Sequence, residues 1–179
     1  MQDIYIVSGA RTAIGGLGGS LSGFRPAELG TIVIKEAVAR AGITADKVQN
    51  VVIGSVVPTQ PKDAYVSRVA AVNAGVPIEA PAMTVNRLCG SGLQAIVSAA
   101  QGIALGEQDI AIGGGAEVMS GALRVVEGTR NGVKLGHMVL QDMMLGALHD
   151  PFEDVHMGIT AENVAESCQI TREEQDAAA

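Results

Sequence analysis

The chain has 179 residues, of which 47% are hydrophobic and 17% are charged. A chain of this size and apolar content can bury one good core, which excludes a disordered polypeptide. The net charge of −7, with only 12 Lys and Arg residues, leaves no basic surface for duplexes, so no nucleic acid partner is expected. The apolar runs are far shorter than the roughly 20 residues of a spanning helix, so no membrane partner is expected either.

The cysteines and the start of the chain bear on the cellular compartment. Cys89 and Cys168 form no CxxC pair, so their spacing supports neither a zinc ribbon nor a disulfide scaffold. The first residues show no basic segment, apolar core and cleavage site in succession, and this argues against a secretory signal. We expect a cytoplasmic protein.

The first elements in chain order are a strand, a loop and a helix. Residues 4–7 are a short apolar run ended by Ser8 and Gly9, which predicts a buried strand. The glycine-rich residues 15–19 lack a lysine at phosphate-loop spacing and predict a loop. Pro26 suits the first position of a helix that Gly42 ends. Apolar residues recur along it at helical spacing, namely Leu29, Ile32, Val33, Ala37 and Ala41.

Strands and helices alternate through the next part of the chain. Short apolar runs predict strands over residues 51–57, 82–85 and 109–112. Helical spacing predicts helices over residues 65–74 and 91–106 between them. The apolar repeat of the longer helix is formed by Leu93, Ile96, Val97, Ala100, Ile103 and Ala104. The order β-α-β-α-β-α-β indicates an α/β layered domain whose sheet is covered on both faces.

The pattern changes after Met119. Residues 120–155 have weak periodicity and a turn-like stretch at 130–132, which predicts a long excursion from the core of a kind that is usually functional. Two helix starts follow, at Thr160 and at Thr171, and the second has the form of a capping box with Glu174. Because the chain stops soon after this cap, we expect a truncated polypeptide.

Cys89 is the residue whose position favours chemistry. It lies between a predicted strand and the first turn of a helix, where free amides and the helix dipole favour a thiolate. Gly90 and Gly92 carry no side chains, so a large ligand could approach the sulfur, and the Cys89 and Gly90 amides are candidate oxyanion donors. The pattern predicts a nucleophile that forms a covalent intermediate. The alternative is a buried thiol that acts as a small hydrophobe.

The same residues allow a second interpretation. Residues 90–95 fit the GxGxx[GA] fingerprint of a dinucleotide-binding Rossmann domain, with Gly90 and Gly92 at the phosphates and Glu117 at the ribose. The match is weak, because that fingerprint normally follows the first strand and this one follows the third.

Four segments resemble blocks of the thiolase family, in family order. The sequence NRLCGSGLQAI at residues 86–96 is similar to the active-site signature of the thiolases, the acetyl-CoA acetyltransferase family. The other blocks are residues 7–15, 113–120 and 156–163. The resemblance implies an N-terminal α/β domain over residues 1–118 and a truncated loop domain over residues 119–179 that serves oligomerisation and faces CoA. It also implies a C-terminal thiolase domain that is absent here.

The activity implied by the resemblance is acyl transfer between CoA thioesters. Two acetyl-CoA molecules would condense to acetoacetyl-CoA, with reverse thiolysis, through an acyl-enzyme on Cys89. His156 and Met157 match positions that line the pantetheine end of CoA. Coenzyme A thioesters would be substrates and not cofactors, and the full-length protein would be a homotetramer.

Several catalytic residues of the thiolase family have no match within these 179 residues. The activating histidine, the second catalytic cysteine and the water-positioning asparagine come from the second half, and Cys168 does not match that cysteine. We therefore expect residues 1–179 alone to be inactive, and the second hypothesis is an incomplete, non-catalytic domain that binds a partner half or folds only in part. His137, His149 and His156 do not share a metal-ligand spacing, so no metal is expected.

Overall fold

The computed structural model describes residues 3–179. They belong to two compact units, Met1–Leu123 and Arg124–Ala179. Among the described residues, no helix has both the length and the hydropathy needed to cross a membrane.

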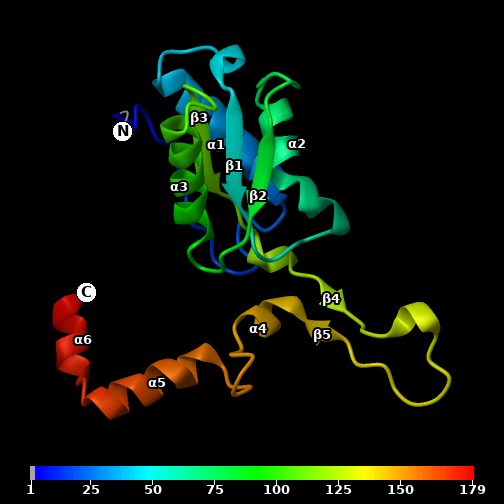
Figure 1. Ribbon diagram of the computed structural model, residues 1–179. Coiled ribbons are helices and arrows are strands. Elements are labelled where there is room, and N and C mark those ends of the chain that lie inside the picture. The colour runs from blue at the N-terminus through cyan, green and yellow to red at the C-terminus, as the bar shows by residue number, and fades with distance from the viewer. Residues whose placement is uncertain (1–2) are drawn as a thin grey trace. The chain divides into compact units, whose positions relative to one another are not determined.

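The N-terminal unit is built on a three-stranded parallel sheet (Figure 1). The central strand β1 (Asn50–Gly54) pairs with β2 (Ala82–Val85) on one side and with β3 (Ala111–Gly115) on the other. Val51, Val52 and Ile53 of β1 are at most 2% exposed. A continuous buried run of this kind is typical of a parallel strand with helices on both faces. The predicted α/β layered architecture is therefore confirmed.

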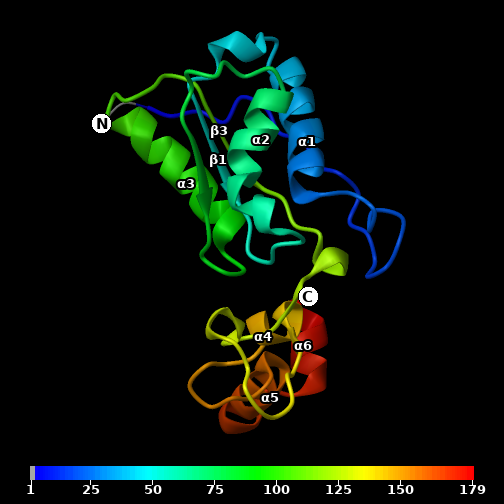
Figure 2. The same ribbon diagram turned by 90° about the vertical axis from the view of Figure 1, so that its right-hand side faces the viewer.

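Helices cover the two faces of this sheet unequally. α1 (Pro26–Arg40) and α2 (Val66–Asn73) lie on one face and α3 (Ser91–Ala104) lies on the other (Figure 2). The alternation of β1 side chains divides the core accordingly. Val51 and Ile53 pack with residues of α1 and α2, whereas Val52 packs with Ala95 and Ala99 of α3.

α3 meets the sheet through its small residues. Ala95, Ala99 and Gly102 are buried, whereas Leu93 of the predicted apolar repeat is 69% exposed. A Cβ on Gly113 of β3 would lie 2.6 Å from Ile96 Cα, so the helix and strand backbones nearly touch. This close approach leaves no room for large side chains, and the large apolar residues of α3 lie on its other faces.

The strand predicted over residues 4–7 is absent. Residues 3–16 have no regular secondary structure, and Tyr5, Ile6 and Val7 are 77%, 84% and 76% exposed. The segment is held to α1 just after this run, where the Ser8 hydroxyl donates to the Ala37 carbonyl oxygen at 2.7 Å. A local apolar pattern does not make a strand without a pairing partner, and the described residues supply none.

The last strand of the sheet also differs from the prediction. β3 begins at Ala111 and continues through Gly113, Gly114 and Gly115, whereas the prediction placed the strand at residues 109–112 and the glycines after it. The register pairs these glycines with Val52, Ile53 and Gly54 of β1. Strands usually avoid glycine, and one that contains several marks a site where another backbone comes close.

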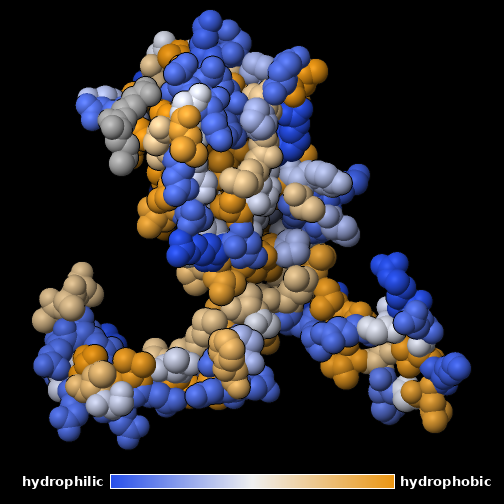
Figure 3. Space-filling view, viewed as in Figure 1, coloured by the Kyte–Doolittle hydropathy of each residue, from blue (hydrophilic) through white to orange (hydrophobic). Residues whose placement is uncertain are grey.

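The C-terminal unit contains three helices and a short antiparallel ladder. The helices are α4 (Met143–Ala147), α5 (Met157–Cys168) and α6 (Arg172–Ala178), and the ladder pairs β4 (Arg124–Val125) with β5 (Gln141–Asp142). No residue from 124 to 179 is buried, and hydrophobic and hydrophilic residues alternate over its surface in Figure 3. The predicted capping box is confirmed, because Thr171 N–H donates to Glu174 Oε2 at 2.8 Å and Glu174 N–H donates to Thr171 Oγ1 at 3.2 Å.

Candidate active site

The carboxyl ends of the three parallel strands bring the candidate residues to one edge of the sheet. The turn that carries Cys89 follows β2, Glu117 follows β3, and Val56 and Val57 follow β1. In α/β sheets this edge is where ligands bind. The N-terminal unit therefore presents its candidate chemistry at the expected place.

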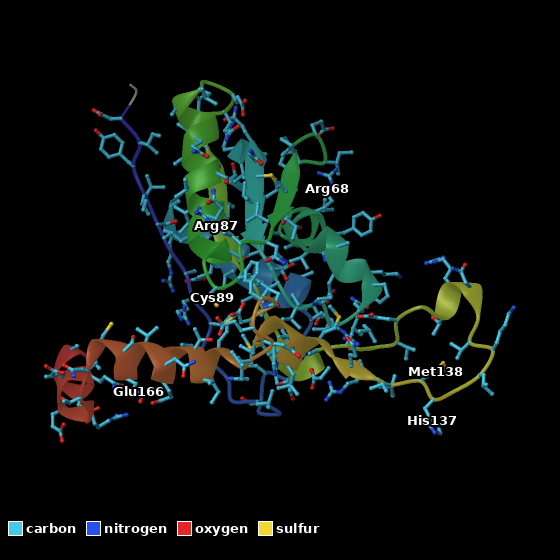
Figure 4. The ribbon with its side chains drawn as sticks, turned by 60° about the horizontal axis from the view of Figure 1, so that its bottom comes forward. Arg68, Arg87, Cys89, His137, Met138 and Glu166 are labelled. Carbon is cyan, nitrogen blue, oxygen red and sulfur yellow. The ribbon has the colours of Figure 1, made fainter. Side chains whose placement is uncertain are left out.

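The turn between β2 and α3 has an unusual backbone. Leu88, directly before Cys89, has a φ of +47°, in the left-handed region that residues other than glycine seldom adopt. The turn is closed by Gly90 N–H, which donates to Arg87 O at 3.1 Å, and by Ser91 N–H, which donates to Leu88 O at 3.0 Å. These bonds close the turn directly before α3, and Figure 4 shows Cys89 at this end of the helix.

The Cys89 side chain is exposed beside the start of α3, so it is not a buried hydrophobe. α3 begins at Ser91 with no N-cap side chain bonded to it. Within residues 3–179, no acceptor makes a hydrogen bond with the Gly92 or Leu93 amide. Amides of a first helical turn are free to bind an anion or a polarised carbonyl oxygen.

The expected pair of oxyanion donors needs a correction at Gly90. Its N–H donates to Arg87 O, so the turn itself already uses this amide. The Cys89 amide makes no hydrogen bond within residues 3–179 and remains a candidate donor, and the free Gly92 and Leu93 amides of the first turn of α3 replace that of Gly90. Sequence spacing could not separate these amides, because the distinction depends on the left-handed residue at position 88.

Glycines of the sheet support the first turn of α3. A Cβ on Gly54 of β1 would lie 2.5 Å from the Ser91 carbonyl carbon and 2.8 Å from Gly92 N. A Cβ on Gly115 of β3 would lie 3.4 Å from Gly92 Cα. The helix start therefore rests directly on the backbone of two strands, which gives the turn before it a rigid base.

Glu117 binds the loop that follows β1. Its carboxylate accepts hydrogen bonds from Val56 N–H at 2.9 Å and from Val57 N–H at 3.1 Å. Burial raises the pKa of Glu117, with a further rise from the nearby charge of Asp63, and the two amide bonds offset only part of this. Both carboxylate oxygens are engaged, so the structure gives no support to Glu117 as a ribose ligand.

Asp63 organises the next part of the same loop. Its carboxylate accepts from the Thr59 amide at 2.7 Å, the Thr59 hydroxyl at 2.8 Å and the Gln60 amide at 3.2 Å. Burial raises the pKa of Asp63, but the hydrogen bonds from Thr59 and Gln60 outweigh it, and the pKa lies below its ordinary value. The loop beside Glu117 is thus fixed by an ionised carboxylate.

The two residues expected to contact CoA lie in the C-terminal unit. His156 is the exposed N-cap of α5, and its Nδ1 accepts from Gly158 N–H at 3.0 Å. An accepting Nδ1 places the proton of the neutral ring on Nε2. Met157 follows in the first turn of the helix and is partly exposed.

The structure also shows a contact that the sequence did not predict. The His149 and His156 rings pack edge to face with their centroids 5.6 Å apart, because residues 149–156 form a short hairpin. No group of three or more potential metal ligands occurs among residues 3–179. His137 is exposed on the loop before β5, together with Met138 (Figure 4). Cys168 is exposed at the end of α5.

Comparison with known proteins identifies the family. The family model of the thiolase N-terminal domain matches residues 4–179. The chain belongs to the thiolase family. A β-ketothiolase, BktB, from Cupriavidus necator is 60% identical over 178 residues, which are 99% of this chain and 45% of that protein. An acetyl-CoA acetyltransferase from Pseudomonas aeruginosa is 46% identical, with the same coverage of 99% and 45%.

The thiolase fold is shown by solved structures as well. The crystal structure of human mitochondrial 3-ketoacyl-CoA thiolase in complex with CoA matches with a TM-score of 0.92 and 36% identity, over 97% of this chain and 44% of that one. The present chain thus spans less than half the length of these thiolases. The comparisons favour the thiolase interpretation and give no support to a dinucleotide-binding domain.

Proposed function

We propose that the protein carrying this chain transfers acyl groups between CoA thioesters, with the Cys89 thiolate as the nucleophile. The observation that carries the proposal is the exposed Cys89 side chain two residues before α3, whose first-turn Gly92 and Leu93 amides are free, in a chain of the thiolase family. Two relatives are named as a β-ketothiolase and an acetyl-CoA acetyltransferase, which supports the same reaction class.

The first step forms an acyl-enzyme. Cys89 Sγ attacks the carbonyl carbon of acetyl-CoA, the bond from that carbon to the CoA sulfur breaks, and CoA leaves as the thiol after taking a proton. Amides at a helix start can stabilise the oxyanion that forms on the carbonyl. In this chain the Gly92 and Leu93 amides are suited to that role.

The second step makes the carbon–carbon bond. A second acetyl-CoA loses a proton from its α-carbon, and that carbon attacks the acyl group on Cys89. The thioester bond to Cys89 breaks, the thiolate returns, and acetoacetyl-CoA leaves. Thiolysis is the same sequence in reverse. The groups that move the protons are assigned to the second half of the thiolase chain, as the family resemblance implies.

The C-terminal unit is proposed to contact the substrate and other subunits. His156, with its Nε2–H directed away from the Gly158 bond, and Met157 would line the pantetheine arm of CoA. The loop domain, taken from residue 119 onward, would support a homotetramer. Both described cysteines are free thiols, which fits a reducing compartment such as the cytoplasm.

An activity assay with paired cysteine variants tests the proposal. Acetoacetyl-CoA thiolysis and acetyl-CoA condensation are measured on the full protein, on Cys89→Ala and on Cys168→Ala. We expect Cys89→Ala to abolish both reactions, and Cys168→Ala, which alters the other exposed thiol, to retain them. Full activity of Cys89→Ala would refute the proposed nucleophile. Turnover by residues 1–179 alone would refute the assignment of the proton-moving groups to another part of the protein.

A further inference from the structure

The turn that carries Cys89 has a single buried anchor among its neighbours in sequence. Residues 86–90 are all exposed, whereas Ser91 is only 4% exposed. Ser91 is buried because its backbone lies on Gly54 of β1, where even a methyl group would overlap it. The position of the Cys89 turn relative to the sheet therefore depends on the hydrogen bonds that Ser91 makes.

The Ser91 hydroxyl forms hydrogen bonds with the backbone before and after the Leu88 Cα atom. It accepts a hydrogen bond from Arg87 N–H at 2.8 Å and donates one to Leu88 O at 2.6 Å. The Asn86 side chain adds one bond to the same residue, since its Oδ1 accepts from Leu88 N–H at 2.9 Å. Together these bonds close the turn around Leu88, whose φ of +47° is unfavourable for a leucine.

We infer that Ser91 is a positioning residue for the acyl-transfer reaction, because its hydroxyl keeps Leu88 in the left-handed conformation that aims Cys89 along the start of α3. The inference rests on the proposed function and deepens it. The sheet fixes Ser91 through Gly54, Ser91 fixes Leu88, and Leu88 sets the direction of the next residue, Cys89. The hydroxyl itself acts on the turn and not on the substrate.

Substitutions at position 88 can distinguish the positioning role of Ser91 from a general effect of its hydroxyl on stability. Without the Ser91 hydroxyl, Leu88 can relax toward negative φ and turn Cys89 away. Glycine at position 88 adopts positive φ without steric cost, so it should keep the turn even when the hydroxyl is lost. A β-branched residue at position 88 opposes positive φ more strongly than leucine does, so it should disturb the turn even when the hydroxyl is present.

The test measures acetylation of Cys89 by acetyl-CoA on the full protein, in single-turnover mixing experiments. Ser91→Ala is expected to slow acetylation by about ten-fold, since small misplacements of a reacting atom cost one to two orders of magnitude. The double variant Ser91→Ala/Leu88→Gly is expected to recover most of that loss. Thr31→Ala on α1 is the control, because its hydroxyl donates to Ala27 O and to no residue of the turn, and it should acetylate at the parental rate.

A second series keeps the inference testable if Ser91→Ala does not fold. Leu88→Gly and Leu88→Met should acetylate within two-fold of the parent, and Leu88→Val should be several-fold slower, with unchanged KM for acetyl-CoA. Equal acetylation rates across the position-88 series, or a parental rate in a folded Ser91→Ala variant, would overturn the inference. Loss in Ser91→Ala without recovery in the double variant would overturn it too, since the hydroxyl would then act by another route.

A readout without CoA separates this inference from the proposed function. Iodoacetamide alkylation of Cys89 is followed by peptide mass mapping, with the exposed Cys168 of the other unit as internal reference. If the parent is not acetylated, the proposed function fails, and the ratio of the two alkylation rates still reports on the turn. The ratio should fall in Ser91→Ala and recover in the double variant, and an unchanged ratio would contradict the positioning role.

Discussion

The helices of the N-terminal unit and those of the C-terminal unit begin in different ways. At the start of α2 and α3 no N-cap side chain accepts a hydrogen bond, and at α1 the only cap is the Glu28 carboxylate, which accepts from Arg25 N–H at 2.7 Å. In contrast, Asp142, His156 and Thr171 each accept such bonds at the start of α4, α5 and α6. The first group has a buried core and the second has no buried residue. Packing against a sheet thus stabilises one set of helices, and local capping stabilises the other.

This difference has a consequence for the candidate active site. A helix start without a side-chain cap leaves its first amides free, and at α3 these amides belong to Gly92 and Leu93, three and four residues after Cys89 in the chain. Such an uncapped start costs stability, and close packing of α3 on the glycines of β1 and β3 offsets that cost. The N-terminal unit, which has the buried core, can therefore leave the first amides of α3 without hydrogen-bond partners.

The largest expected effect comes from opening the core of the N-terminal unit. Ile34 of α1 is 1% exposed, and replacing a buried isoleucine by alanine typically lowers the free energy of unfolding by about 2–5 kcal/mol. We expect a loss near the middle of that range for Ile34→Ala in urea denaturation.

Phe152 in the C-terminal unit is the matched control for this substitution. It is a larger apolar residue but is 93% exposed, so Phe152→Ala should change the free energy of unfolding by less than about 0.5 kcal/mol. Equal losses in the two variants would contradict the difference between the units.

The next effect tests the close approach of α3 to the sheet with two neighbouring glycines. A Cβ on Gly113 would lie 2.6 Å from Ile96 Cα, whereas a Cβ on Gly114 would meet nothing within 4 Å. We expect Gly113→Ala to destabilise the unit by about 2 kcal/mol through overpacking. Gly114→Ala should stay within about 0.5 kcal/mol of the parent. Thermal unfolding of both variants is the measurement, and similar melting temperatures would show that α3 moves freely on the sheet.

A smaller and local effect is expected from the cap of α6. Thr171→Ala removes the hydroxyl that accepts from Glu174 N–H, which costs about 1 kcal/mol of local helix stability. Amide hydrogen exchange should accelerate over residues 172–178 while the unfolding of the N-terminal unit stays unchanged. Thr160→Ala, inside α5, is the control. Unchanged exchange over residues 172–178 in Thr171→Ala would mean that α6 does not depend on its local cap.

The smallest effect concerns the pH dependence of stability at Glu117. Burial raises the pKa of Glu117 above its ordinary value of 4.5, so the folded state favours the protonated carboxyl. Its contribution to stability is complete below pH 4.5 and is lost as the pH rises through the raised pKa. Glu117→Gln should make the free energy of unfolding depend less on pH in this range. The free energy is measured by urea denaturation from pH 4 upward. A slope that persists in Glu117→Gln would refute the assignment of this pH dependence to Glu117.

Asp63 should act in the opposite direction at lower pH. Its pKa lies below the ordinary value of 3.8 in the folded state, so its contribution is present above pH 3.8 and is lost as the pH falls through the folded pKa. Asp63→Asn should therefore lower the free energy of unfolding of the unit at neutral pH. In strong acid the free energies of unfolding of the variant and the parent should become more similar.

Local patterns predicted the elements whose cause is local. The capping box at Thr171 follows from adjacent residues, and the structure confirms it. The position of Cys89 at a strand-to-helix turn could also be predicted from the pattern around it, whereas its exposure could not, because the pattern left a buried thiol open. The thiolase family was indicated by four short blocks spread along the chain, and the match over residues 4–179 shows it.

Other features depend on contacts between distant segments. The run at residues 4–7 has the composition of a strand, but pairing decides whether a strand forms. The buried face of α3 follows from glycines in β3, which no helical repeat in α3 itself can reveal. The roles of Ser91 and Glu117 depend on a buried hydroxyl and a half-buried carboxylate whose partners are backbone groups, and a sequence shows backbone groups only as positions along the chain.

The most direct test of the account is the mass of the intact protein before and after mixing with acetyl-CoA. We predict a gain of one acetyl group that peptide mapping places on Cys89, that Cys168→Ala retains and that Cys89→Ala loses. An acetyl gain that persists in Cys89→Ala, or a folded parent that gains none, would contradict the claim that Cys89 carries the acyl group.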